Sequence, residues 1–255
     1  MSDFPNVVAA KMPEEKPDAP HMSFVDHLKD LRNSLVAVFI GIAVCSVLTL
    51  TFASNLVGIL SGPLQKSFTG AELIGTSPAE AFMLKLQVGI YSAIVVSLPW
   101  TFYQVWKFIA PGLYPEEKKS ALPFVFFTSV AFISGVLFCY YLVFPIAFTF
   151  FSGEFISLDI KPTIKVSEYL SFVLKSSLVF GFVFETPVLA GILGRLGLIT
   201  DQTLLRNWRM AVVVMFILAA VLTPPDVASQ LCLALPMCVL YALCIFILKR
   251  VNPHS

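Results

Sequence analysis

Charged residues are scarce in this chain, and their scarcity excludes an ordinary soluble domain. Of 255 residues only 13% are charged and 57% are hydrophobic, whereas soluble domains carry roughly 25% charged residues. The net charge of +1 provides neither a basic surface for a nucleic acid nor an acidic field. The composition therefore indicates a protein embedded in a lipid bilayer, with no nucleic-acid partner.

Residues that could hold a metal or act as nucleophiles are equally few. The three histidines lie outside the apolar runs, and the five cysteines are odd in number and form no C-x-x-C pair. Cysteines within apolar runs usually serve as small hydrophobic packing residues. No serine accompanies a base in a catalytic arrangement. We therefore expect no metal centre, no cofactor and no enzymatic activity.

The amino-terminal segment lacks the basic stretch, apolar stretch and small-residue cleavage site of a secretory signal peptide. Residues 1–21 are instead polar, rich in proline and mixed in charge. We expect a disordered cytoplasmic tail over residues 1–22, a single six-helix transmembrane domain over 23–250, and a second cytoplasmic tail over 251–255.

Long apolar runs are what the sequence does contain. A spanning helix needs about 20 apolar residues, and six runs approach that length: residues 35–53, 81–105, 122–144, 170–193, 210–222 and 227–248. The fifth run is short and needs extra turns from residues 200–209 to cross a bilayer. The pattern predicts an all-α membrane protein with six transmembrane helices, of which the fifth and sixth are short. The longer connections are expected at residues 54–77 and 145–169.

Capping residues mark two of the boundaries. Ser77, Pro78 and Glu80 form a capping box with proline at the first helical position. The residues from Thr223 to Asp226 are all that separates the last two runs. We therefore expect the last two helices to form a tight helical hairpin.

The distribution of basic residues predicts the orientation. Cytoplasmic connections of membrane proteins carry an excess of lysine and arginine. Of the 17 lysines and arginines, the side with the two longer connections has only Lys66, Lys85, Lys161, Lys165 and Lys175. Both termini are therefore expected in the cytoplasm.

Two acidic features lie on the expected cytoplasmic side. Residues 23–35 are amphipathic, with Asp26 and Asp30 opposite an apolar stripe made of Phe24, Leu28, Leu31 and Leu35. These carboxylates are either a solvated face or a site for a cation.

Between the second and third runs, prolines and a glycine at residues 111–115 predict a rigid elbow, which Glu116 and Glu117 follow. That pair either stabilises a helix start or helps to bind a peptide that presents basic and hydrophobic residues together.

Glu185 lies near the middle of the fourth run. Insertion scales assign an acidic residue there a cost of about 2.5–3.5 kcal/mol, and such residues usually face a partner or a wet cavity. Glu185 is therefore either a functional group or a hydrogen-bonding partner of a neighbouring helix. Gln230, early in the sixth run, is its expected polar counterpart.

Several stretches together resemble the TatC family, the multi-spanning receptor subunits of the twin-arginine protein translocase. They are HLKDLR (27–32), YQVWKFIAPGLYPEEKK (103–119), VFPIAFTFF (143–151), YLSFVLK (169–175), FGFVFETPV (180–188) and LTPPDVASQ (222–230). The resemblance implies a glove-shaped, concave bundle of six helices in the bacterial cytoplasmic membrane, with both termini cytoplasmic.

The resemblance also implies a function and the residues that perform it. Members of the family bind the twin-arginine signal peptides of folded precursor proteins, which are then exported at the expense of the proton-motive force. By this resemblance Asp30 and Glu117 are the receptor carboxylates, although the family usually has glutamate where this chain has Asp30. The surrounding signal-peptide surface comprises Leu28, Arg32, Phe108, Pro111, Leu113 and Tyr114.

The family also assembles with the single-span subunits TatA and TatB. The resemblance implies that these partners pack against the fifth and sixth helices, where Ala220, Thr223 and Gln230 occupy the matching positions. It further implies several copies of the chain in a complex of TatB and TatC.

Two other functions fit parts of the sequence. A proton-coupled small-solute transporter would use Glu185 as a proton relay, yet such proteins commonly show internal repeats and interrupted helices, and we find no convincing repeat. A passive assembly scaffold would tolerate neutralisation of Asp30 and Glu117. The twin-arginine receptor is the main prediction.

Overall fold

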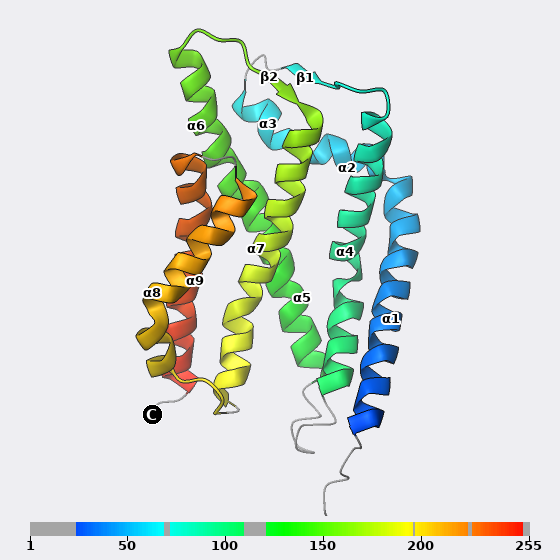
Figure 1. Ribbon diagram of the computed structural model, residues 1–255, viewed down its shortest axis with the longest axis vertical. Coiled ribbons are helices and arrows are strands. Elements are labelled where there is room, and N and C mark those ends of the chain that lie inside the picture. The colour runs from blue at the N-terminus through cyan, green and yellow to red at the C-terminus, as the bar shows by residue number, and fades with distance from the viewer. Residues whose placement is uncertain (1–23, 69–71, 110–120, 196, 224–225, 252–255) are drawn as a thin grey trace, which may run out of the picture.

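The computed structural model describes residues 24–68, 72–109, 121–195, 197–223 and 226–251. Five of the spans are single helices: α1 (Phe24–Thr51), α4 (Glu80–Ile109), α7 (Val166–Arg195), α8 (Asp201–Leu222) and α9 (Val227–Val251), of which α8 and α9 do not reach the upper end in Figure 1. A sixth span combines α5 (Ala121–Phe138), the π-helical turn η3 (Cys139–Val143) and α6 (Phe144–Ser157). Six helices in the described chain are long and apolar enough to cross a membrane, which confirms the six predicted spans. The predicted tails lie outside the described residues, except that α9 continues to Val251.

The two ends of the bundle differ in structure. The start of α1, the end of α4, the start of α5, the end of α7 and the end of α9 lie together at the end drawn lowest in Figure 1, here called the lower end. The opposite, upper end carries α2 (Ala53–Leu60), α3 (Gly62–Ser67) and the short strands β1 (Glu72–Ile74) and β2 (Thr163–Lys165). The two strands pair in parallel, with Leu73 opposite Ile164. The two long connections predicted at this end therefore contact each other through these paired strands.

The third span is longer than the sequence suggested. We expected residues 145–157 to belong to a connection, but α6 extends the span as a helix to Ser157. Proline is tolerated in the first turn of a helix, where its missing N–H group has no intrahelical partner. Pro145 occupies such a position in α6, directly after the π-helical turn. The predicted boundary at residue 144 is therefore wrong.

Glu80 caps α4 and also connects α4 to α7. Its Oε2 atom accepts a hydrogen bond from the backbone N–H of Ser77 at 3.2 Å, which is the glutamate half of the predicted capping box. Its Oε1 atom accepts from the backbone N–H of Ser167, at the start of α7, at 3.3 Å. One side chain thus holds the upper ends of two spanning helices together.

The last two spans begin as the sequence predicted. Thr200 Oγ1 accepts from the backbone N–H of Thr203 at 3.3 Å, so that α8 gains the extra turns it needs. Asp226 Oδ1 accepts from the backbone N–H of Ser229 at 2.7 Å at the start of α9. The antiparallel α8 and α9 form the predicted hairpin (Figure 1), and they are the shortest of the single-helix spans.

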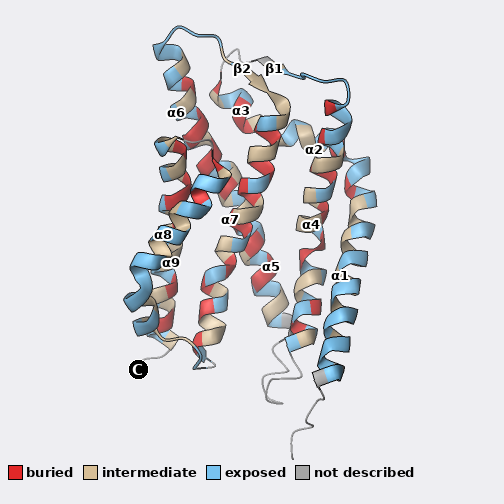
Figure 2. Cartoon of the chain, viewed as in Figure 1, coloured by how far each residue is buried: buried red, intermediate tan, exposed pale blue. Residues whose placement is uncertain are grey.

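Burial is concentrated in the middle of the bundle, where α5 and α7 cross (Figure 2). Phe132 of α5 and Phe180 of α7 are fully buried there. In the most apolar windows of α1 and α8 only 6% of the residues are buried, against 33–39% in the other four spans. These two edge helices therefore leave most of their apolar surface for lipid or for other subunits.

Candidate functional site

The lower ends of α1 and α4 are fixed side by side by an aromatic stack. The ring of His27 lies on that of Phe108, with centroids 4.5 Å apart and an interplanar angle of 25°. Higher up, Trp100 Nε1 donates to the carbonyl oxygen of Ala37 at 2.9 Å. Asp30 is three residues after His27, so it lies on the same side of α1 one turn higher. The half-buried Asp30 is thereby placed close to the last turns of α4.

Two other predicted residues of α1 are on the surface. Leu28 is 47% exposed, and Arg32 is exposed with a long hydrogen bond of 3.4 Å from its Nη2 atom to Asn33 Oδ1. Neither side chain is buried in the hydrophobic core. The first two turns of α1 therefore present acidic, basic and apolar groups together at the lower end.

The helices on either side of the elbow, α4 and α5, meet at the lower end. Ile109 ends α4 and Ala121 begins α5, and the ring of Trp106 lies 4.7 Å from that of Phe124, so the two helices meet at the lower end. The Nε1 atom of Trp106 is buried and has no hydrogen-bond partner in the structure described. The remaining predicted residues lie outside the described residues: Pro111, Leu113, Tyr114 and Glu117.

Glu185 is buried inside α7 with only 4% of its surface exposed. Neither carboxyl oxygen has a hydrogen-bond partner in the described part of the chain. One turn earlier, a Cβ atom on Gly181 would meet the Cζ atom of Phe132 at 2.4 Å, which shows how closely α7 packs on α5 here. A buried polar group without a partner is costly, so this carboxyl group is a candidate for an interaction with another molecule.

The predicted pairing of Glu185 with Gln230 is wrong. Gln230 Nε2 instead donates to the carbonyl oxygen of Phe216 at 3.0 Å, across the α8–α9 hairpin. Gln230 thus forms a hydrogen bond within the α8–α9 hairpin and none with Glu185 of α7.

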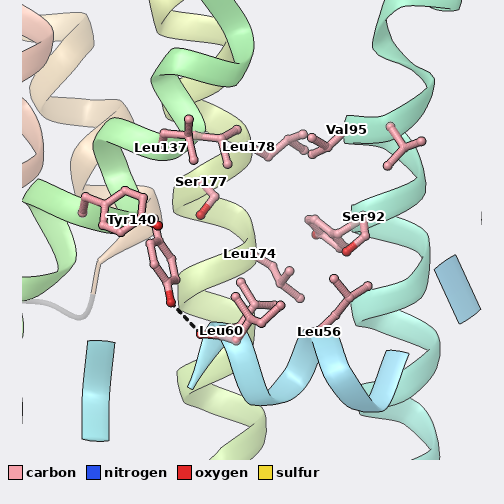
Figure 3. A pocket seen from close by; sticks show the side chains of 14 residues that line it. Leu56, Leu60, Ser92, Val95, Leu137, Tyr140, Leu174, Ser177 and Leu178 are labelled. Carbon is pink, nitrogen blue, oxygen red and sulfur yellow. Dashed lines mark hydrogen bonds between the residues drawn. The ribbon is translucent and has the colours of Figure 1, made fainter. Parts of the chain in front are cut away.

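A cavity of about 310 Å³ opens between α4, α5, η3 and α7. It is closed by α2, which is drawn at the bottom of Figure 3 and lies towards the upper end of the bundle in Figure 1. Its walls are almost entirely apolar, for example Leu56, Val95 and Leu178. Ser92 and Ser177 add hydroxyl groups from facing helices. The cavity can therefore receive an apolar segment with few polar atoms.

Two tyrosines hold α2 across the upper end of this cavity. Tyr140 Oη donates to the carbonyl oxygen of Ile59, and Tyr169 Oη donates to that of Leu60, each at 2.7 Å. These carbonyls belong to the last turn of α2, whose acceptors would otherwise lack helical partners. Because the two tyrosines come from η3 and α7, they tie α2 to both walls of the cavity.

A second, shallower groove lies on α8, with a volume of about 380 Å³ and lined by Val212, Val213, Phe216, Ile217, Ala220 and Gln230. Ala220 and Gln230, both predicted to contact a partner helix, thus line one groove. Thr223 does not line it, since it is buried and donates its hydroxyl to the carbonyl oxygen of Ala219 at 2.9 Å. Within α8 as described, Ala219 is the buried residue, so the helix exposes most of its surface.

Sequence reasoning missed the cavity and the two tyrosine ties. The cavity depends on how α4 and α7 diverge below α2, and no local motif encodes that divergence. A weak signal was present, because Tyr140 and Tyr169 are hydroxyl-bearing side chains in otherwise apolar stretches and a buried tyrosine usually needs a hydrogen-bond partner.

Comparison with known proteins identifies the family. The family model of Sec-independent protein translocase protein (TatC) matches residues 26–236. The chain belongs to the TatC family. TatC of Campylobacter jejuni subsp. jejuni is 39% identical over 229 residues, covering 89% of this chain and 94% of that protein. TatC of Helicobacter pylori strain J99 is 44% identical over 227 residues, covering 89% of each.

A solved structure shows the same fold. The crystal structure of a twin-arginine translocase receptor TatC superposes with a TM-score of 0.83 at 33% identity, covering 89% of this chain and 99% of that one. The TatC assignment made from the sequence motifs is therefore confirmed, together with the concave six-helix bundle. Membership in a protein translocase family favours the translocase prediction over the small-solute transporter.

Proposed function

We propose that this TatC chain is the receptor for twin-arginine signal peptides, and that they bind where the start of α1 meets the connection between α4 and α5. The observation that carries the proposal is the stack of His27 on Phe108. It holds Asp30 beside the end of α4, from which the elbow with Glu117 continues. A receptor subunit of this kind binds and assembles and needs no catalytic residue or cofactor.

The chemistry of two carboxylates suits two arginines. A guanidinium group is a planar fork that a carboxylate can meet with two parallel hydrogen bonds, whereas a lysine supplies charge without that geometry. Asp30 and Glu117 would each take one arginine of the pair. Surface ion pairs contribute only about 0–1 kcal/mol each, so a large part of the affinity must have another source.

That source is the hydrophobic segment of the signal peptide. Leu28 and Phe108 offer apolar surface beside the carboxylates, and the cavity below α2 offers about 310 Å³ of apolar space inside the bundle. Apolar burial contributes about 25 cal/mol per Å², so a few buried side chains outweigh both ion pairs. Charge then selects the signal, and apolar contact retains it.

We further propose that single-span TatA and TatB helices pack in the groove on α8. Ala220 leaves room there, and the amide of Gln230 uses one N–H in its bond to Phe216. Its other N–H and its oxygen remain for a polar residue of an arriving helix, an interaction of about 0.6–2 kcal/mol in model systems. Thr223 remains a predicted contact whose hydroxyl oxygen can still accept a bond. The exposed edges α1 and α8 suit an assembly of several TatC copies with TatB.

The proposed orientation places the lower end in the cytoplasm of the bacterium, with the chain in its cytoplasmic membrane. The start of α1 and the end of α9 lie at the lower end, which also has the greater share of the described basic residues, as the positive-inside rule requires. The signal-peptide surface at the lower end would then face newly made precursors.

The experiment is photo-crosslinking from position 108 in membranes that contain the partner subunits. A twin-arginine signal peptide should crosslink, and a twin-lysine version should crosslink less. Asp30→Ala and Glu117→Ala should each lower the yield up to about fivefold, while Glu154→Ala, an exposed carboxylate on α6, should leave it unchanged. Equal crosslinking of both signals, or full yield in both variants, would contradict the proposal.

A further inference from the structure

The lower ends of α7, α8 and α9 meet at one corner of the bundle (Figure 1). A small hydrophobic core separate from the main one holds them together, made of Ala190, Cys244 and Leu248 with Ile199 and Leu204 packed on it. Tyr241 Oη of α9 also donates to the carbonyl oxygen of Leu204 in α8 at 2.9 Å. The three helix ends are therefore fixed relative to one another.

Basic side chains surround this small core. We call them the basic corner, and they are Arg195, Arg206, Arg209, Lys249 and Arg250, all exposed. Within residues 190–209 and 241–251 the one acidic residue is Asp201. No ion pair joins any member of the basic corner to another described residue. The corner therefore carries positive charge that the described chain does not neutralise.

Aromatic rings lie beneath two of these guanidinium groups. The guanidinium of Arg209 is 5.8 Å from the ring centroid of Trp208, and that of Arg250 is 5.2 Å from the ring of Phe246. Trp208 is 50% exposed and Phe246 is 55% exposed. Exposed aromatic rings at the ends of spanning helices are typical of the membrane interface, and a cation over such a ring is held by its quadrupole.

We propose that the basic corner binds the headgroup of an anionic phospholipid. A phosphate accepts two parallel hydrogen bonds from one guanidinium group, and Arg206 and Arg209 are three residues apart on one side of α8. The exposed side chains of Leu205 and Met210 extend from the same turns as apolar surface for the acyl chains. A nucleic acid or an acidic soluble protein would leave these apolar groups in water.

The negative charge of the lipid is an essential part of the proposal. A zwitterionic headgroup carries its own ammonium, which the basic corner repels, whereas each basic residue near an anionic surface strengthens binding about fivefold. The start of α1 lies at the opposite side of the lower end in Figure 1, and its mixture of Lys29, Asp30 and Arg32 offers no comparable excess of positive charge. This proposal concerns lipid alone and does not depend on signal-peptide recognition.

Trp208 provides a direct readout. The protein is reconstituted in phosphatidylcholine with increasing fractions of brominated phosphatidylglycerol or brominated phosphatidylcholine, and quenching of tryptophan fluorescence is measured. Trp208→Phe supplies the background from Trp100 and Trp106. The relative association constant at Trp208 should favour phosphatidylglycerol about fivefold or more, and Arg206→Gln with Arg209→Gln should lower that preference several-fold, with the remainder due to Arg195, Lys249 and Arg250. Equal quenching of the unsubstituted protein by the two lipids, or a preference that both substitutions leave unchanged, would overturn the proposal.

Two controls sharpen the result. Lys66→Gln with Lys161→Gln removes basic residues that lie away from the corner, in α3 and before β2, and should leave the preference intact; its loss would mean that overall charge attracts the lipid. Inorganic phosphate at millimolar concentration should not abolish the preference, because a free anion gains no acyl-chain contact. Loss of the lipid preference in the presence of phosphate would show a general anion site.

If the double arginine variant does not reconstitute, Lys249→Gln with Arg250→Gln should lower the preference in the same assay, and an unchanged value would count against the basic corner.

Discussion

Glu185→Leu is expected to stabilise the isolated subunit and to abolish export. Both carboxyl oxygens of Glu185 are buried without a hydrogen-bond partner among the described residues, and the side chain is 4% exposed. Leaving a polar group in that state costs about 1–3 kcal/mol, which an apolar side chain of similar size would recover. For a protein of this size, that gain corresponds to an increase of about 2–12 °C in the unfolding midpoint.

The expected loss of export rests on the absence of a hydrogen-bond partner for Glu185 among the described residues. If Glu185 is held for a partner helix or for an inserted signal peptide, leucine removes that bond while Glu185→Gln keeps a donor and an acceptor in place. Glutamine should therefore retain assembly and export, and it should leave the unfolding midpoint nearly unchanged.

Thermal unfolding of the purified subunit in detergent and transport of a folded precursor into membrane vesicles measure the two halves separately. A midpoint that falls in Glu185→Leu would refute the reasoning, because it would mean that the carboxyl group stabilises the subunit. Export that is lost equally with glutamine would assign the role to charge or proton transfer.

Three further substitutions, two of them with a matched control, test the packing and the partner groove. Gly181→Ala should destabilise by about 1–3 kcal/mol, because its Cβ atom would lie 2.4 Å from a ring on α5, whereas Gly153→Ala meets nothing within 4 Å and should be neutral or stabilising in the same thermal assay. Glu80→Gln should lower the unfolding midpoint more than Glu154→Gln, because only Glu80 bridges α4 and α7. Gln230→Leu should weaken crosslinking of a partner helix placed in the α8 groove; unchanged crosslinking there would argue against that docking site.

The spans and their starts could be predicted because local chemistry determines them. Apolar length gave the six spans, and the capping residues at 77–80 and 223–226 marked two helix starts, where the structure has Glu80 and Asp226 accepting hydrogen bonds from backbone N–H groups. The error came at Pro145, where sequence rules read proline as the end of a span. A π-helical turn shifted the helix so that the proline falls in a first turn, and that shift depends on packing rather than on the residues nearby.

The candidate sites depended more on tertiary contacts. Asp30 was identified by its motif, but only the stack of His27 on Phe108 shows that the start of α1 lies against the end of α4. The expected pairing of Glu185 with Gln230 failed because helix depth was judged from sequence position. Gln230 instead donates to the backbone carbonyl oxygen of Phe216 across the α8–α9 hairpin. The sequence does not show which backbone carbonyl lies within reach of this side chain.

The distribution of burial explains why this subunit depends on its surroundings. Its central helices are packed on several sides, whereas α1 and α8 bury only 6% of their apolar windows. In lipid no hydrophobic force drives apolar helices together, so these edges gain little from one another and remain available to partners with polar or closely fitting side chains. Tyr140 and Tyr169 hold α2 across the end of the cavity. A bundle built in this way leaves both edges accessible, which the proposed binding of a signal peptide and of partner helices requires.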